Sequence, residues 1–251
     1  MTAVSTDGQL HERVRELEAE LAARRREAAE NERQLERYAA DLRETFKEER
    51  ARAQELRHSY MLTVRALASA VEARDAYTGR HAERVAAYGL RLAAACGMQL
   101  GDHPEIEFGF LLHDAGKVAV PDAILFKPGP LTSAERLIMQ QHPVTGWEIV
   151  RDIEFLGAAR DVIRHHHERW DGTGYPDGLV GEAIPVHARV FAVADALDAL
   201  TTDRPYRAAV GWVEARANLR EAAGSQLDPT MFAAYDTIPD EAFDRIREGV
   251  A

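Results

Sequence analysis

Along the first part of the chain, side chains at alternating intervals of four and three positions form one stripe of an α-helix. The positions of this stripe, called the seam, are Leu10, Val14, Leu17, Leu21, Ala28, Asn31, Leu35, Tyr38 and Leu42. No glycine lies between Gly8 and Gly79, and Arg, Glu, Ala and Leu, all strong helix formers, dominate this stretch. The pattern predicts one long amphipathic helix, and its heptad spacing favours a coiled coil.

The seam is interrupted by charge, because Arg24, Glu49 and Arg52 occupy positions that the repeat assigns to it. Two alternatives to a coiled coil therefore stay open: a single charged helix, and a segment that is partly disordered. We expect a parallel dimeric coiled coil over residues 1–59, since a lone helix has nothing against which to bury this stripe. A more apolar run then continues the helix into a globular domain, which we expect at residues 60–251.

In the remainder of the chain, apolar residues recur at helical spacing, and no alternating run is long enough to promise a sheet. One apolar helix is expected to stop at Gly116, and residues 120–132 form a loop that is rich in proline and glycine. Thr132 then begins a helix that contains His142, because Glu135 three residues later completes a capping box. The sequence therefore predicts an all-α fold.

Composition narrows the function and the compartment. The 251 residues carry a formal net charge of -11, which argues against nonspecific nucleic-acid binding through a basic surface. Cys96 is the only cysteine, so no intrachain disulfide can form and a reducing compartment fits. The N-terminal residues lack the apolar core of a signal peptide, and no apolar run approaches the roughly 18 residues that span a membrane. We expect a cytoplasmic protein with neither nucleic-acid nor membrane partners.

Histidines and aspartates interrupt several of the apolar helices. The set comprises His113, Asp114, His142, His166, His167, Asp195 and Asp198. Each residue alone has an ordinary explanation as a helix cap, a hydrogen-bonded core histidine or part of an exposed turn. Together they are best explained by bound metal ions, because uncompensated buried carboxylates are costly and metal ions supply the missing positive charge. Mixed imidazole and carboxylate ligands suit iron, manganese or zinc better than calcium.

Four motifs follow one another in the same part of the chain. They are HDAGKVAVPDAILFKPGPLT, MQQHPVTGWEIV, HHHERWDGTGYPDGLVGEAIP and ARVFAVADALDALTTDRPYR. Over residues 60–232 the chain resembles the HD-GYP family of bacterial cyclic-di-GMP phosphodiesterases, metal-dependent phosphohydrolases of the HD superfamily, and the eponymous His113-Asp114 and Gly174-Tyr175-Pro176 are intact. The resemblance implies an all-α HD-domain helical bundle with the HD-GYP extension. It also implies hydrolysis of cyclic di-GMP to linear pGpG and, in some members, on to GMP.

The resemblance also implies a role for each matching residue. The implied protein ligands are His113, Asp114 and Asp195 for one metal ion, and Asp114, His142, His166 and His167 for the other. Asp114 would bridge the two ions, since one carboxylate has two oxygens. Lys117 matches the family's phosphate-binding lysine and is implied to act with Asp114 in catalysis.

Further matches concern the substrate. Besides Lys117, the substrate-binding residues that the resemblance implies are Tyr175, Asp198, Arg204 and Arg207. Tyr175 would line the pocket, and the two arginines would contact guanine or phosphate. His165 is expected to be a bystander, because the family motif uses the two histidines directly before Glu168.

The sequence departs from the family pattern in one place. Members with three metals carry a glutamate four residues before a histidine in this region, and here Tyr77 stands four residues before His81. A phenol is a poor replacement for a carboxylate at a hard cation, so we expect two divalent ions per chain, iron or manganese. His81 is then either a ligand or a hydrogen-bonding neighbour, and pGpG is the expected main product.

Three other interpretations remain at this stage. An HD hydrolase of another cyclic dinucleotide would use the same metal chemistry. A catalytically inactive module would bind cyclic di-GMP and signal through the coiled coil, although such members usually lose ligands. An adaptor would use the coiled coil as its main feature. We expect an active enzyme that binds cyclic di-GMP, forms a homodimer through the coiled coil and responds to an upstream sensory or regulatory protein.

Overall fold

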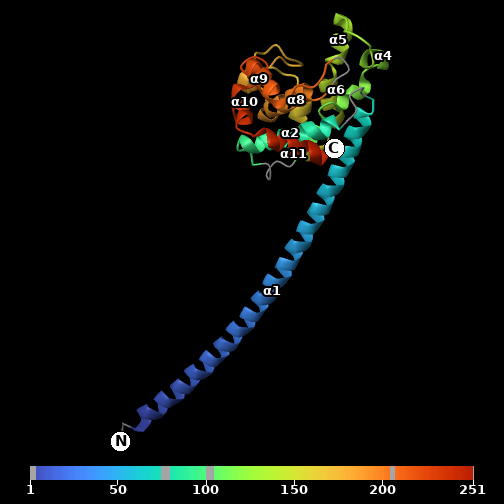
Figure 1. Cartoon of the computed structure of the whole chain (residues 1–251). Coiled ribbons are helices and arrows are strands. Elements are labelled where there is room, and N and C mark those ends of the chain that lie inside the picture. Colours follow the sequence, from blue (N-terminus) through green and yellow to red (C-terminus); the bar gives the residue numbers. More distant parts are fainter. Residues whose placement is uncertain (1–3, 75–79, 100–104, 204–206, 251) are drawn as a thin grey trace. The chain divides into compact units, whose positions relative to one another are not determined.

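The computed structural model of the chain describes residues 4–74, 80–99, 105–203 and 207–250, which form helices joined by turns and loops (Figure 1). The α-helices are α1 (Val4–Glu72), α2 (His81–Ala95), α3 (Ile106–Leu112), α4 (Asp122–Leu125), α5 (Ser133–Met139), α6 (His142–Val150), α7 (Ala159–His165), α8 (Val186–Thr201), α9 (Trp212–Ala222), α10 (Pro229–Asp236) and α11 (Asp240–Val250). The short 3-10 helices are η1 (Ala115–Ala119), η2 (Glu154–Leu156) and η3 (Gly181–Ala183). The described residues contain no β-strand, so the predicted all-α fold is confirmed for them.

The chain divides into two compact units, residues 1–59 and residues 60–251. In the first unit, α1 carries intrahelical ion pairs such as Arg13–Glu16 and Glu20–Arg24. The seam is exposed, with Leu10 at 65% and Leu35 at 67%. The coiled coil therefore stays a prediction, and its seam is accessible to a second chain. Among the described helices, none combines the length and apolar character needed to cross a membrane.

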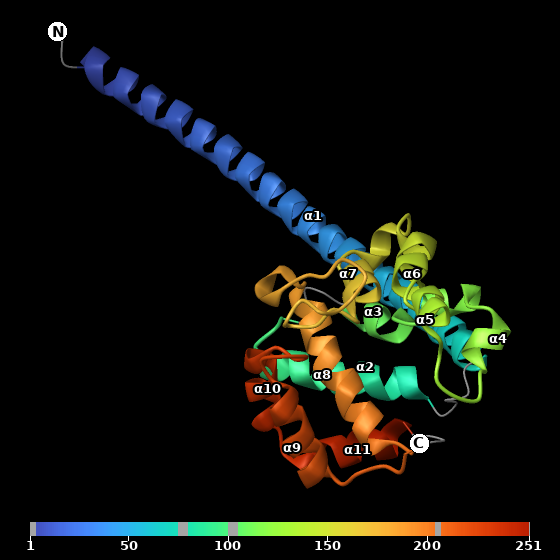
Figure 2. The same ribbon diagram turned by 90° about the horizontal axis from the view of Figure 1, so that it is seen from above.

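The core of the second unit lies where α2 and α8 cross (Figure 2). Large apolar side chains of both helices are fully buried there, among them Tyr88 on α2 and Phe191 on α8. Phe110 of α3 packs on Phe191 with ring centroids 5.4 Å apart, and Phe243 of α11 packs edge-on against Tyr88. Burial of each such ring stabilises the fold by roughly 1.5–3 kcal/mol. The core therefore holds α2, α3, α8 and α11 against one another.

Several helix boundaries differ from those predicted. The apolar helix expected to stop at Gly116 ends at Leu112, and a short helix, α4, forms within the expected loop. The capping box of Thr132 and Glu135 is present, but the helix that it begins ends at Met139. His142 begins a new helix, α6, so its predicted place in the first helix is wrong. Pro143 explains the break, because proline has no N–H to continue the earlier helix and is favoured at a helix start.

Helix α6 lies unusually close to η1. A Cβ atom at Gly116 would come 1.9 Å from the carbonyl oxygen of His142 and 2.5 Å from the backbone nitrogen of Gly146. No side chain can occupy that space, so glycine is required for the two backbones to approach. This contact brings the start of α6, where His142 lies, next to Asp114 just before η1.

Candidate metal centre

Three buried histidines are each fixed by a backbone carbonyl three residues earlier. The Nδ1 atoms of His113, His142 and His166 lie 2.9, 2.7 and 3.0 Å from the carbonyl oxygens of Phe110, Met139 and Ile163, respectively. These carbonyls belong to the last turns of α3, α5 and α7, where an α-helix leaves them without partners. Because a carbonyl only accepts, each Nδ1 must donate, and the neutral ring keeps its lone pair on Nε2.

The three Nε2 atoms converge on Asp114. The Nε2 atom of His113 lies 3.1 Å from Oδ2, and that of His142 lies 3.3 Å from Oδ1. The Nε2 atoms of His142 and His166 are 3.2 Å apart, although neither carries a proton in the neutral ring. Oδ1 of Asp114 is buried and accepts no hydrogen bond within the described structure. Lone pairs that face one another around a buried carboxylate oxygen fit a bound cation.

The ligand atoms form two groups that share Asp114. The four-residue group consists of Asp114, His142, His166 and His167, and the three-residue group consists of His81, His113 and Asp114. Within each group the ligand atoms all lie within 4.8 Å of one another. Imidazoles with one shared carboxylate suit divalent transition metals, so the residues present fit a centre of this kind.

Asp195 lies beside the three-residue group, with Oδ1 3.6 Å from Nε2 of His81, but it is not one of the residues that meet the 4.8 Å criterion. His81, by contrast, does meet it. The structure thus brings together the implied ligands His113, Asp114, His142, His166 and His167, and it leaves Asp195 beside the three-residue group.

The electrostatics of the site also suit a cation. Burial and the neighbouring imidazoles lower the pKa of His166 well below its usual value. Burial is also the main cause that lowers the pKa of His167, to about 4. Both rings are therefore neutral at pH 7 and keep their lone pairs. Burial would raise the pKa of Asp114, but His113 and Lys117 outweigh it and hold that pKa well below the usual range. Burial would lower the pKa of His113, but the neighbouring Asp114 outweighs it and raises that pKa. An ionised carboxylate beside the neutral imidazoles of His166 and His167 is a donor set for a metal ion.

Asp198 lies elsewhere than expected for a substrate contact. It is 1% exposed, and its Oδ2 accepts a hydrogen bond of 2.7 Å from Nδ1 of His81, while its Oδ1 accepts one of 2.8 Å from Arg84. Burial favours the neutral acid, but these hydrogen bonds outweigh it and lower the pKa of Asp198 to about 2. A carboxylate bonded to Nδ1 directs Nε2 toward the three-residue group, as outer partners of metal-bound histidines do. We therefore interpret Asp198 as the residue that orients His81.

Asp198→Asn tests this role. The charged acceptor of the His81 proton is lost, so affinity for metal at the three-residue group should fall about tenfold to a hundredfold, with the substrate KM of fully metal-loaded protein little changed. Metal affinity is measured by equilibrium dialysis, with the exposed Asp203→Asn as control. A raised KM with unchanged metal affinity would instead show that Asp198 contacts the substrate.

The loop after the histidines is held by Glu168, a role that the sequence pattern did not reveal. Its buried carboxylate accepts hydrogen bonds from the backbone nitrogens of Asp177, Gly178 and Leu179 at 2.7, 3.1 and 3.1 Å. The available signal was a carboxylate beside a loop rich in glycine, because the N–H groups of such a loop need acceptors. A Cβ atom at Gly174 would lie 2.4 Å from the backbone nitrogen of Arg169, so only glycine fits there.

The same loop places Tyr175 beside His167 of the four-residue group. Its ring lies 4.8 Å from the ring of His167, centroid to centroid, and burial raises its pKa. His165 belongs to neither ligand group. Its Nε2 instead lies 3.0 Å from Oδ2 of Asp177 in the loop. Tyr175 therefore borders the site, while His165 helps to hold the loop.

The remaining predicted residues are placed as follows. Nζ of Lys117 lies 2.7 Å from Oδ2 of Asp114. Arg207 is exposed, and its guanidinium donates a hydrogen bond to the carbonyl of Ala199 near the end of α8. Tyr77 and Arg204 lie outside the described residues.

Comparison with known proteins identifies the family of this chain. A family model described as HD domain matches residues 16–231. The chain belongs to the HD-domain family. The predicted resemblance is thereby confirmed, and the His-Asp pair after which the family is named is His113-Asp114, of which Asp114 belongs to both ligand groups and His113 to one.

Two curated relatives and one solved structure place this HD-domain chain more closely. The chain is 43% identical over 169 residues to the cyclic di-GMP phosphodiesterase response regulator RpfG of Xanthomonas campestris pv. campestris, covering 66% of this chain and 45% of the relative. It is 40% identical over 193 residues to 3'3'-cGAMP-specific phosphodiesterase 2 of Vibrio cholerae, covering 76% and 34%. The chain thus spans less than half the length of either relative.

The solved structure supports the fold. A cyclic GMP-AMP specific phosphodiesterase of V. cholerae superposes with a TM-score of 0.54 at 18% identity, covering 73% of this chain and 52% of the other. At this identity the likeness concerns the arrangement of the HD-domain helices alone.

Proposed function

We propose that this chain is a metal-dependent phosphodiesterase that hydrolyses cyclic di-GMP to linear pGpG. The observation that carries the proposal is the shared position of Asp114, whose carboxylate belongs to both ligand groups and lies 2.7 Å from Lys117. The relatives named as cyclic di-GMP and 3'3'-cGAMP phosphodiesterases support the substrate class, because they are 43% and 40% identical to this chain over 169 and 193 residues. Hydrolysis breaks one P–O3' bond, with water supplying a hydroxyl to phosphorus and a proton to the released 3'-oxygen.

The chain's own residues would divide the work as follows. His142, His166 and His167 would hold one divalent ion, and His113 with His81 or Asp195 would hold the other. Asp114 would bridge both. Two such ions supply Lewis acidity and activate water at neutral pH.

Substrate contacts complete the proposal. Lys117, whose Nζ lies 2.7 Å from Asp114, would bind a phosphate oxygen. Tyr175 would form a wall of the pocket over His167. Arg204 and Arg207 would contact guanine or phosphate, since a guanidinium can make paired hydrogen bonds to either. Iron or manganese, two ions per chain, is the proposed cofactor.

Turnover tests the proposal against its closest alternative. Purified full-length protein loaded with Mn(II) or Fe(II) is offered cyclic di-GMP and, separately, 3'3'-cGAMP, and the products are separated by chromatography. Cleavage of cyclic di-GMP to pGpG is the expected result. If cGAMP is cleaved more than about tenfold faster in kcat/KM, the second candidate, suggested by the 40% identical relative, replaces the first. Cleavage of neither by metal-loaded protein would leave the inactive binding module.

We also propose that α1 assembles two chains through the seam. The seam residues are exposed in the single chain, and burial of a repeat of this type in a parallel coiled coil would cover them. A truncated chain that begins at Ser59 should therefore lose most of its dimerisation in light scattering. It should keep basal hydrolysis, because every proposed ligand lies after that point. A full-length chain that is monomeric at micromolar concentration would contradict this assembly.

A further inference from the structure

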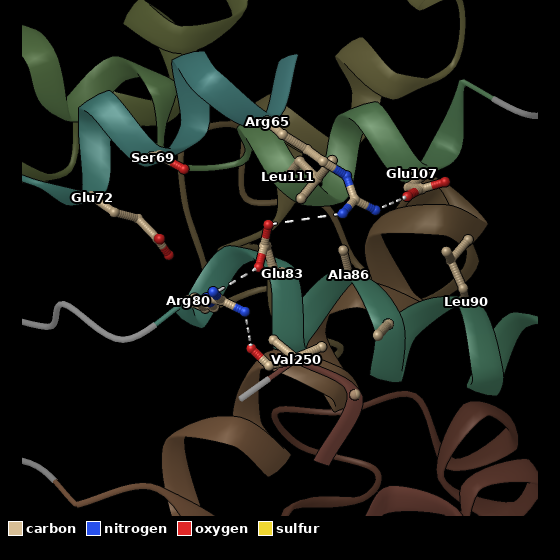
Figure 3. A pocket seen from close by; sticks show the side chains of 12 residues that line it. Arg65, Ser69, Glu72, Arg80, Glu83, Ala86, Leu90, Glu107, Leu111 and Val250 are labelled. Carbon is tan, nitrogen blue, oxygen red and sulfur yellow. Dashed lines mark hydrogen bonds and ion pairs between the residues drawn. The ribbon is translucent and has the colours of Figure 1, made fainter. Parts of the chain in front are cut away.

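The C-terminal part of α1 and the helices α2 and α3 together line a cavity of about 550 Å³. The three-residue group has its residues at the start of α2 and just after α3. Figure 3 shows side chains from α1, α2, α3 and the C-terminal helix around this cavity, including Arg65, Glu72, Glu83, Glu107 and Val250. Val64 and Ala68 of α1 are buried, 4% and 5% exposed, so this part of the helix belongs to the core. The side chains that follow them in α1 therefore have fixed positions.

The first turn of α2 is capped from another helix. Its N-cap residue, Arg80, has a left-handed backbone with φ of 56° and makes no side-chain capping hydrogen bond. The N–H groups of a first turn have no partners within their own helix. One of them, on Ala82, donates a hydrogen bond of 2.5 Å to Oε1 of Glu72, whose carboxylate points toward the start of α2 (Figure 3). Its negative charge also suits the positive end of the helix dipole.

We propose that Glu72 is a positioning residue for His81, a role that rests on the metal centre of the proposed phosphodiesterase. His81 is the first residue of α2 and directly precedes Ala82, so the cap fixes the backbone from which its ring projects. Asp198 fixes the ring itself through Nδ1. Glu72 also lines a small cavity of about 20 Å³ together with His81, His113 and Asp114. Backbone and ring are thus held independently, and Nε2 is directed into the three-residue group.

Glu72 can act in this way because its own position is fixed. On α1, the Nη2 atom of Arg65 lies 3.2 Å from Glu107 of α3. Two residues after Glu72, Arg74 donates hydrogen bonds of 2.6 Å to the carbonyl of Val118 and 2.7 Å to Oδ1 of Asp122. Val118 directly follows Lys117. The end of α1 therefore contacts the metal centre's surroundings at two points, the start of α2 and the segment after Lys117. A shift of this helix end would change the geometry of the three-residue group.

A cap and a metal ligand respond differently to substitution. Glu72→Gln keeps an oxygen that can accept from Ala82 but loses the carboxylate that a hard cation prefers. Glu72→Ala removes the acceptor, and Glu72→Asp keeps the charge on a side chain too short by one methylene to reach. A positioning role therefore predicts that the Gln variant behaves like wild type and that the Ala and Asp variants do not.

The experiment measures Co(II) binding to full-length protein by dialysis and by the visible absorption of bound Co(II). For Glu72→Ala and Glu72→Asp, affinity at the weaker site should fall about tenfold to a hundredfold. For Glu72→Gln it should stay within about threefold of wild type, because a neutral acceptor keeps the hydrogen bond with less electrostatic strength. Glu83, in the same turn of α2 and the same cavity, makes long ion pairs of 3.8 Å with Arg65 and Arg80 (Figure 3). Glu83→Gln is therefore the matched control and should leave binding within about threefold of wild type. Circular dichroism checks that each variant is folded.

Three outcomes would overturn the proposal. The first is wild-type Co(II) affinity and absorption in the folded Glu72→Ala and Glu72→Asp variants. The second is an equal loss of Co(II) affinity in the Glu72→Gln and Glu72→Ala variants, which would make Glu72 a ligand. The third is a loss of affinity in Glu83→Gln as large as in Glu72→Ala. Co(II) binding needs no substrate, so the measurement reports on Glu72 even if wild-type protein cleaves no cyclic dinucleotide. Failure of the proposed function and failure of this inference are therefore distinguishable.

Discussion

Asp114→Asn should reduce hydrolysis of cyclic di-GMP by on the order of a thousandfold or more and abolish tight metal binding at both ligand groups. The substitution keeps the size and shape of the side chain. It removes the only carboxylate that both groups share, and it removes the negative charge that compensates the cations. The amide nitrogen would also face imidazole lone pairs or a cation. Turnover and metal content per chain are measured together on the same preparation.

Retention of fold separates this effect from a general loss of structure. Asp152→Asn changes an exposed aspartate paired only with its neighbour Arg151 at 3.7 Å, and it should leave both quantities unchanged. Helicity of Asp114→Asn should equal that of wild type, since relief of a buried charge does not disturb the helices around it. A folded Asp114→Asn protein that keeps more than a few per cent of wild-type turnover would show that Asp114 does not bridge the metals.

Gly116→Ala should both destabilise the second unit and weaken the metal centre. The added methyl group would lie 1.9 Å from the carbonyl oxygen of His142, which is backbone and can give way only if α6 moves. Overpacking of this kind costs about 1–3 kcal/mol of unfolding free energy, and more where backbone must shift. Because His142 begins α6, the same movement carries its Nε2 away from Asp114. Urea denaturation measures the first effect, and Co(II) affinity measures the second.

A matched glycine distinguishes the contact from a general effect of glycine replacement. Gly211, the N-cap residue of α9, has no atom within 4 Å of where a Cβ would lie, so Gly211→Ala should cost no more than about 1 kcal/mol, the scale of a changed helix cap. If Gly116→Ala showed the stability and metal affinity of wild type, the close approach of α6 and η1 would not be what holds His142 in place.

The helices were largely predictable because they follow local rules. Periodic apolar positions predicted the long N-terminal helix and the helical character of the globular part, and Thr132 with Glu135 predicted a capped helix start. Where the prediction failed, the cause was also local: Pro143, the second residue of α6, has no N–H to continue the helix that Thr132 caps, so His142 begins a separate helix. Periodicity alone does not show such a break, because the apolar spacing continues across it.

The ligands were predictable in kind, whereas their supporting contacts were not. A histidine at the end of an apolar helix is visible in the sequence, and the family resemblance supplied the set. The hydrogen bond between His81 and Asp198 joins residues 117 positions apart, and that from Ala82 to Glu72 joins two different helices. Such contacts depend on how helices cross, which no local pattern specifies. Asp198 was therefore expected at the substrate, and no sequence pattern pointed to Glu72.

The central claim is that hydrolysis depends on metal held by the shared carboxylate, and a metal titration of the full-length chain tests it most directly. Metal-free protein is titrated with Mn(II) while bound ions and cleavage of cyclic di-GMP are measured in the same samples, with Asp114→Asn in parallel. Turnover should be absent without metal, rise as ions bind, and level off at about two ions per chain. The Asp114→Asn variant should stay inactive throughout the titration. Cleavage by metal-free protein in the presence of chelator, or saturated metal binding without any cleavage, would contradict the account.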